Sequence, residues 1–149
     1  MDEKRYEYRR GKDVFNYEFE SEGPKGSIVK KVRFDLMTEF PFLVYNIAFG
    51  DWNVKQEKLD DSVTTNNADK REVLATVADV ILKFIHVHPD AFIYAEGSTP
   101  SRTRLYQMAI SSFYADISKL LTIKGQIKKQ WQLFRKGVNY EAFLAKKRK

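Results

Sequence analysis

FLVYNIAF, residues 42–49, is an almost uninterrupted apolar run, and VLATVADVILKFI, residues 73–85, repeats its apolar side chains at helical spacing. A short continuous apolar run favours a central strand, whereas apolar residues three and four positions apart favour a helix with one buried face. The change of period between these two segments decides the fold class. We expect an α+β domain in which helices pack against a sheet.

The residues before this change of period have the pattern of a β-hairpin. Residues 14–20 and residues 27–35 both alternate apolar side chains with polar ones. EGPKG, residues 22–26, lies between them and is typical of a hairpin turn, because Gly and Pro supply the turn dihedrals. Lys30 falls on the inward face of the second segment, so we expect its ammonium group to snorkel to the surface or to form an ion pair.

The second half of the chain alternates helices and strands after a polar connection over residues 50–65. Asn66 and Asn67 are N-cap candidates for the first helix, and Pro89 ends it. The expected elements are a helix over 68–87, a strand over 91–95, a helix over 100–121, a strand pair or one bent strand over 123–133, and a last strand over 140–145. The order β-β-β-β-α-β-α-β-β predicts a single mixed, mainly antiparallel sheet with two helices in one domain, residues 1–149.

Composition excludes several classes of protein. The chain has no Cys, two His and no apolar run approaching the length of a membrane span, and its N-terminus is charged throughout. Disulfides, thiolate metal sites and a Cys nucleophile are excluded, and we expect a cytoplasmic protein without a signal peptide or membrane contact. Because His86 and His88 would need carboxylates for every other ligand, we expect no metal site, and we expect no cofactor.

Basic charge is concentrated at the C-terminal end. Residues 119–149 contain ten Lys or Arg and Glu141 as the only acid, a net charge of +9, whereas residues 1–118 have a net charge of −3. A positive stretch of this kind attracts polyanions, of which nucleic acid is the commonest in a cytoplasm and acidic proteins come next. A solvated basic surface explains the same pattern, and we expect residues 146–149 to form a disordered tail.

EGSTPSRTRLY, residues 96–106, is the segment most like a binding site. It lies between a buried strand and a helix, where the first backbone N–H groups of the helix lack intrahelical acceptors and form the positive end of its dipole. An ordinary N-cap with Pro100 at the first helical position, and arginines in a solvated face or a buried pair, accounts for the same residues. The alternative is an anion site, with Arg102 its best-placed arginine, formed by Gly97, Ser98, Thr99, Ser101, Arg102 and Arg104.

The same segment carries a family resemblance. GSTPSRTRLY, residues 97–106, together with FNYEF at 15–19 and SEGPKG at 21–26, resembles a small uncharacterised bacterial family of about this length. The resemblance extends over nearly the whole chain. That family has no established activity, so the resemblance implies one bacterial domain and no particular chemistry.

Three functions are compatible with these features. The first is binding of an RNA or DNA backbone. The aromatic residues Phe134, Tyr140 and Phe143 lie among the basic ones, and they either stack bases or fill the core. Besides the helix N-terminus, the expected phosphate ligands are Lys124, Lys128, Lys129, Arg135 and Lys136.

The other two functions need a different partner. The order of the elements resembles the N-acyltransferase superfamily without its early helices, and this resemblance implies Glu96 or Tyr106 as a general acid or base. The superfamily has a glycine-containing loop for the coenzyme A pyrophosphate, whereas residues 63–72 contain no Gly. The third function is binding of an acidic protein partner, as one component of a regulatory or toxin–antitoxin pair.

Overall fold

The alternating N-terminal segments form a strand meander in the computed structural model, which describes residues 4–13, 15–53, 55–60 and 67–149. The first four strands pair antiparallel in chain order, and a short fifth strand pairs with the far end of the fourth. These strands are β1 (Arg9–Arg10), β2 (Asn16–Gly23), β3 (Gly26–Thr38), β4 (Val44–Asn53) and β5 (Lys58–Asp60).

The second half adds three helices and four strands. They are α1 (Lys70–Val87), β6 (Phe92–Ala95), α2 (Pro100–Ser112), α3 (Tyr114–Ile117), β7 (Leu121–Ile127), β8 (Gln130–Leu133) and β9 (Ala142–Lys147). The strands join one sheet in the order β1-β2-β3-β4-β6-β9-β7-β8, with β6 parallel to β4 and the other pairs antiparallel. The expected mixed, mainly antiparallel α+β sheet is confirmed.

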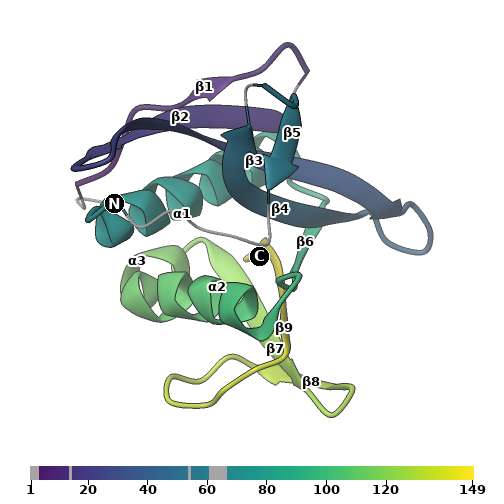
Figure 1. Ribbon diagram of the computed structural model, residues 1–149. Helices are drawn as coiled ribbons and strands as arrows, with labels where there is room; N and C mark the ends of the chain where they lie inside the picture. Colours follow the sequence, from purple (N-terminus) through teal and green to yellow (C-terminus); the bar gives the residue numbers. More distant parts are fainter. Residues whose placement is uncertain (1–3, 14, 54, 61–66) are drawn as a thin grey trace.

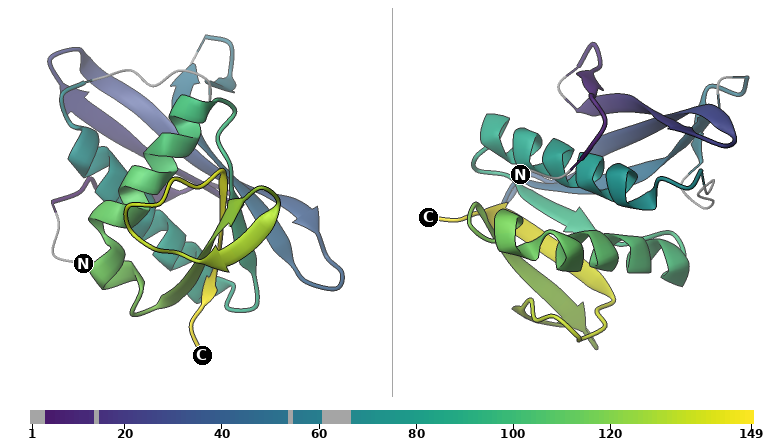
Figure 2. Two further views of the ribbon diagram at one scale, coloured as in Figure 1. Left: turned by 90° about the horizontal axis from the view of Figure 1, so that it is seen from below. Right: turned by 90° about the vertical axis from the view of Figure 1, so that its left-hand side faces the viewer.

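All three helices lie on the same side of the sheet. Figures 1 and 2 show them inside the bend of the sheet, between β2 and β3 on one side and β7 and β9 on the other. The apolar face of α1 is buried there, as its helical spacing requires, together with the inward side chains of the strands. The opposite side of β6, β9, β7 and β8 is not covered by any described helix, and we call it the outer face.

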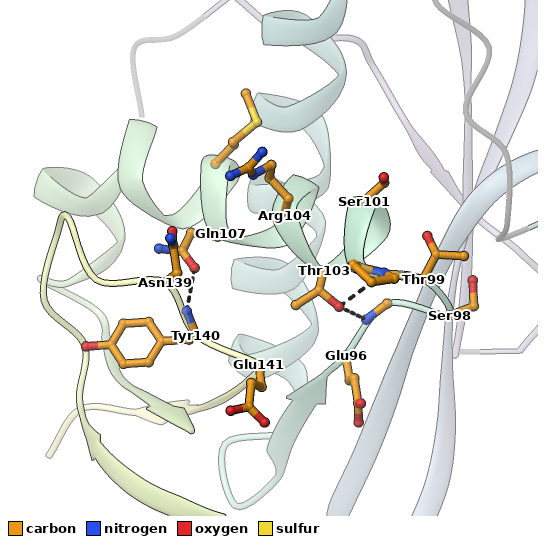
Figure 3. Close-up of a pocket in the computed structure, with 13 residues that line it drawn as sticks. Glu96, Ser98, Thr99, Ser101, Thr103, Arg104, Gln107, Asn139, Tyr140 and Glu141 are labelled. Atoms are coloured by element: carbon orange, nitrogen blue, oxygen red, sulfur yellow. Dashed lines mark hydrogen bonds between the residues drawn. The ribbon is translucent and has the colours of Figure 1, made fainter. Parts of the chain in front are cut away.

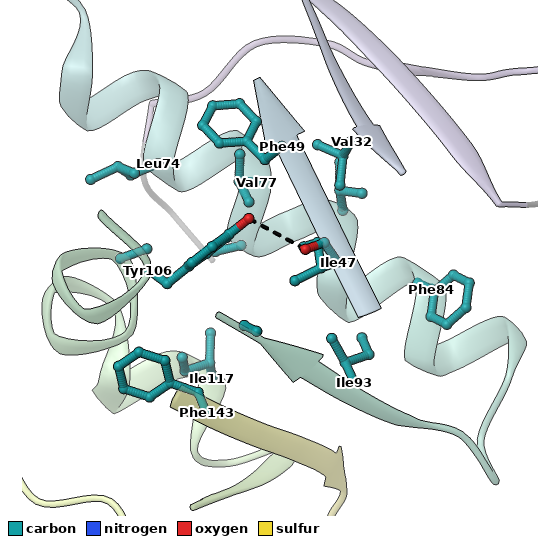
Figure 4. Packing of buried hydrophobic residues seen from close by; sticks show 14 of the residues in the cluster. Val32, Ile47, Phe49, Leu74, Val77, Phe84, Ile93, Tyr106, Ile117 and Phe143 are labelled. Carbon is teal, nitrogen blue, oxygen red and sulfur yellow. Dashed lines mark hydrogen bonds between the residues drawn. The ribbon is translucent and has the colours of Figure 1, made fainter. Parts of the chain in front are cut away.

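The sheet has a gap in its middle that side chains of α2 fill. On the edge of β4 that faces β6, Val44 to Asn46 pair with β6 and Asp51 to Asn53 pair with β5. Residues 47–50, which lie between these two pairings, have no strand partner on this edge. Arg102 donates from its guanidinium to Phe49 O, and Tyr106 donates from its hydroxyl to Ile47 O (Figure 4). Both residues therefore complete the sheet from the helix layer.

Lys30 forms an ion pair, which is one of the two arrangements expected for its ammonium group. The side chain is fully buried on β3, and its Nζ lies 2.5 Å from Asp51 Oδ1 on the neighbouring β4. The pairing satisfies an ammonium group that would otherwise be costly in the core.

Several expected boundaries are wrong. The helix expected over 100–121 ends at Ser112 and is followed by the short α3, because Phe113 and Ile117 are buried and the chain must turn before β7. The connection over 50–65 contains the end of β4 and β5. Asp69, and not Asn67, is the N-cap of α1, while Asn66 and Val14 lie outside the described residues.

The expected disordered tail also differs from the structure. Lys146 and Lys147 belong to β9 and pair with Thr122 and Leu121 of β7. Arg148 continues the contact, because its backbone N–H donates to Leu120 O and its Nε donates to Ser118 O. These contacts hold the basic end of the chain against β7 and the residues just before it.

Candidate functional site

A pocket lined mainly by polar residues lies at the N-terminus of α2, and we call it the α2 pocket. Its volume is about 820 Å³. It is lined by Glu96, Gly97, Ser98, Thr99, Pro100, Ser101, Thr103, Arg104, Gln107, Met108, Asn139, Tyr140 and Glu141. The structure thus brings together five of the six residues expected to bind an anion, and it adds a wall from the segment before β9.

The walls of the α2 pocket are held by hydrogen bonds from Gln107. Its Nε2 donates to Val138 O and its Oε1 accepts from the backbone N–H of Tyr140, which fixes the segment before β9 against α2. Figure 3 shows Arg104 on one side of the cavity and the carboxylates of Glu96 and Glu141 on the other. The charged side chains of the pocket are therefore one guanidinium and two carboxylates.

Arg102 is the expected anion ligand that does not line the α2 pocket. Its side chain is 3% exposed, and its guanidinium lies 5.1 Å from the Phe49 ring centroid as well as donating to Phe49 O. Two residues correspond to about 200° of an α-helix, so residues 102 and 104 lie on different sides of α2 and the two arginines do not meet at one ligand. Arg102 is a structural residue in this arrangement.

The start of α2 is an ordinary N-cap. Thr99 Oγ1 accepts from the backbone N–H of Arg102 at 3.2 Å, the backbone N–H of Thr103 donates to Thr99 O, and Pro100 is the first helical residue. Gly97 must be glycine, because a Cβ there would collide with the backbone N of Thr103. Two of the first backbone N–H groups of the helix, those of Arg102 and Thr103, therefore find their acceptors within the chain.

The basic residues expected to bind phosphate lie on the C-terminal half of the sheet and its loops. Lys124 is exposed on β7, Lys128 and Lys129 form the β7–β8 turn, and Arg135 and Lys136 follow β8. The backbone N–H of Lys128 donates to Glu141 Oε1, so the turn lies beside the α2 pocket. All five side chains belong to the β7–β8 hairpin or to the residues that directly follow it.

The aromatic residues Phe134, Tyr140 and Phe143 fill the core, which is one of the two roles expected for them. All three are at least nine-tenths buried, and their rings contact one another. Exposed aromatic side chains lie elsewhere: Phe40 and Phe42 precede β4, and Trp131 of β8 lies on the outer face, where it contacts the half-buried Tyr94 of β6. The two-residue alternation of FIYA, residues 92–95, is the sequence signal that could have found Tyr94 and Phe92.

The N-terminus of α1 is closed by the β2–β3 hairpin. The buried carboxylate of Asp69 accepts hydrogen bonds from the hydroxyl groups of Tyr6, at 2.6 Å, and Ser21. Asn67 Oδ1 accepts from the backbone N–H of Lys25, and Asn67 Nδ2 donates to Gly26 O. A phosphate at this helix end would be repelled by the buried carboxylate of Asp69, so the described residues do not favour a coenzyme A pyrophosphate site there.

The proposed acid/base groups of the acyltransferase alternative are also engaged. Tyr106 is buried and its hydroxyl donates to Ile47 O, as described above. Glu96 Oε1 accepts a 2.6 Å hydrogen bond from the Tyr94 hydroxyl. Burial and this hydrogen bond raise the pKa of Tyr94 to about 12, so the Tyr94 ring is neutral at physiological pH.

A family model, described as a family of unknown function (DUF6934), matches residues 2–148. The chain belongs to this family. No protein of curated function and no solved structure shows significant similarity to the chain. DUF6934 membership therefore assigns no chemistry, and the function has to be argued from the geometry of this member.

Two further properties of this DUF6934 member concern metals and membranes. Within residues 4–13, 15–53, 55–60 and 67–149, no group of three or more His, Asp or Glu side chains is placed to hold a metal ion. His88 stacks on Phe15, with ring centroids 5.5 Å apart, while His86 is exposed. None of the described helices is long and apolar enough to cross a membrane.

Proposed function

We propose that this protein binds a polyanion, the phosphate backbone of RNA or DNA, through its basic C-terminal region. Support comes from where the fold places the charge. Nine of the ten basic residues of segment 119–149 are exposed, with Lys146 half-buried, and within the described part of the chain none of the ten forms an ion pair. The proposed phosphate ligands are Lys124, Lys128, Lys129, Arg135 and Lys136.

The observation that carries the proposal is the conformation of the β7–β8 turn. Lys128 and Lys129 both have positive φ, 50° and 66°. This left-handed region favours Gly and Asn in hairpin turns and costs other residues about 1–2 kcal/mol each. Stability therefore disfavours lysine at both positions, whereas phosphate binding favours two adjacent charges at an exposed tip.

The α2 pocket is proposed as a second contact, for a single phosphate. Ser98, Thr99 and Ser101 would supply hydroxyl donors and Arg104 a guanidinium, while Gly97 lines the same wall of the pocket. The pocket sets two carboxylates, Glu96 and Glu141, against one guanidinium, whereas the β7–β8 turn sets two lysines against the one carboxylate of Glu141, so the turn and not the pocket dominates the proposed binding.

Replacing the turn lysines by the preferred turn residues should separate stability from binding. The double variant Lys128→Asn, Lys129→Gly is expected to raise the free energy of unfolding by about 1 kcal/mol, because both residues tolerate positive φ. The same variant should lower the slope of log affinity against log salt for a single-stranded oligonucleotide by about 2, since two phosphate contacts are lost. Urea unfolding and fluorescence-anisotropy titrations measure the two effects, and an unchanged slope would remove the turn from the site.

Charge reversal tests the proposed function as a whole. A labelled single strand of about 12 nucleotides and inorganic polyphosphate of similar length should both bind at low salt and dissociate as salt rises from about 50 to about 200 mM. Changing Lys128, Lys129, Arg135 and Lys136 to Glu should weaken both complexes by more than about tenfold.

The matched control reverses four exposed lysines outside the region, Lys12, Lys58, Lys70 and Lys83. Its net charge falls by the same amount, so a general effect of charge predicts equal weakening by both variants. The proposal predicts that the control keeps most of the affinity. Failure of the wild-type protein to bind either polyanion at low salt would refute it.

A further inference from the structure

The outer face carries one contiguous row of side chains across four strands. By register, Tyr94 of β6 is opposite Leu144 of β9, Leu144 is opposite Lys124 of β7, and Lys124 is opposite Leu133 of β8. Trp131 lies in the neighbouring row and reaches across to Tyr94, with ring centroids 6.2 Å apart. This contact confirms that the side chains share one surface.

Phe92 extends this surface along β6. Lys146 of β9 places its Nζ 5.6 Å from the Phe92 ring centroid, and Phe42, before β4, packs edge-on against the same ring. We call Phe92, Tyr94 and Trp131 the aromatic platform. Trp131 is 38% exposed and its neighbour Leu133 is 64% exposed, so the β8 end of the surface is open to solvent.

The charge on these four strands has one sign. β6, β9, β7 and β8 contain Lys124, Lys146 and Lys147 and no acidic residue. Two acids flank these strands: Glu96 follows β6 directly and its carboxylate accepts the hydrogen bond from Tyr94, and Glu141 directly precedes β9 and its carboxylate accepts from the backbone N–H of Lys128. The lysines of the β7–β8 turn adjoin the Trp131 end. The surface thus combines flat apolar rings with cations, which complements a chain of bases joined by phosphates.

We propose that the aromatic platform stacks the bases of a single-stranded nucleic acid while Lys124, Lys146 and the turn lysines bind its phosphates. The inference rests on the proposed function and specifies its ligand class. A duplex offers phosphates but keeps its base faces stacked inside, whereas a single strand exposes both groups to one surface. Without direct reading of base edges, little sequence preference is expected.

The test compares three probes of similar length on the full chain: an oligothymidylate of about 12 nucleotides, the corresponding duplex, and inorganic polyphosphate. The wild-type protein should bind the single strand more tightly than the duplex or polyphosphate. Trp131→Leu should weaken single-strand binding by about 5- to 100-fold and leave polyphosphate binding unchanged, because only the stacking contact is removed. Trp131→Phe should recover part of the loss.

Trp52→Leu is the matched control. Trp52 lies at the end of β4 that pairs with β5, away from the end that pairs with β6, and Lys31 Nζ lies 3.7 Å from its ring centroid. Thermal melts of each variant verify that it is folded. Equal single-strand affinity of wild type and Trp131→Leu, or preference for the duplex, would overturn base stacking on the aromatic platform. In that case, continued binding of polyphosphate by the wild-type protein would still support the proposed polyanion binding. Failure of the wild-type protein to bind any of the three probes would overturn both the aromatic platform and the proposed function. Concentration-dependent dimerisation abolished by Trp131→Leu, without a change in single-strand affinity, would assign the face to a second copy of the chain.

Discussion

Replacing Arg102 by Ala is expected to lower the free energy of unfolding by about 3–5 kcal/mol. The buried guanidinium donates to Phe49 O in the gap of β4 and lies against the Phe49 ring. Its removal leaves a buried carbonyl without a donor and a cavity between α2 and the sheet. Urea unfolding monitored by circular dichroism measures the loss.

The comparison is Arg104→Ala, two residues further along the same helix. Arg104 is exposed and lines the α2 pocket, so its removal should change stability by no more than about 0.5 kcal/mol. Sulfate or phosphate should raise the Tm of wild type and Arg102→Ala by the same amount, because Arg102 does not face the pocket. A mild effect of Arg102→Ala together with loss of the anion-dependent shift would make Arg102 a ligand instead of a structural residue.

Replacing Asp51 by Ala is expected to destabilise the protein by about 3–5 kcal/mol, because it leaves the buried ammonium of Lys30 without its carboxylate. Lys30→Met removes the charge and keeps the apolar volume, so it should cost far less. The double variant Lys30→Met, Asp51→Ala should therefore be more stable than Asp51→Ala alone. Unfolding free energies of the three variants form a double-mutant cycle. Additive effects would show that the two side chains do not interact.

The N-terminal half of the fold could be predicted because its signals are local. Alternation over residues 14–20 and 27–35 with EGPKG between them specifies a hairpin, and the structure pairs Gly23 with Gly26 at its turn. The helical spacing after residue 68 likewise specifies α1. The end of the second helix could not be predicted in this way, because the break at Phe113 arises where the chain must turn to place β7 beside β9.

The candidate site divides in the same way. The cap at Thr99 and Pro100 follows from local chemistry, and so does the concentration of basic residues after residue 118. The burial of Arg102 does not follow from local chemistry, because its guanidinium donates to a carbonyl that lies 53 residues earlier in the chain. The two arginines of one helix turn take opposite roles because one faces the sheet and the other faces solvent.

By itself, the sequence determined the change from strand to helix, the turn chemistry and the charge of each segment, since all three depend on neighbouring residues. Only the tertiary structure decided which aromatic residues are exposed. Strand alternation separates Tyr94 from Ile93 but does not say which face is covered. All three helices pack on one side of the sheet, so Phe134, Tyr140 and Phe143 are buried there, while Trp131 and Tyr94 remain on the outer face. Packing of elements distant in sequence is the physical reason for that choice.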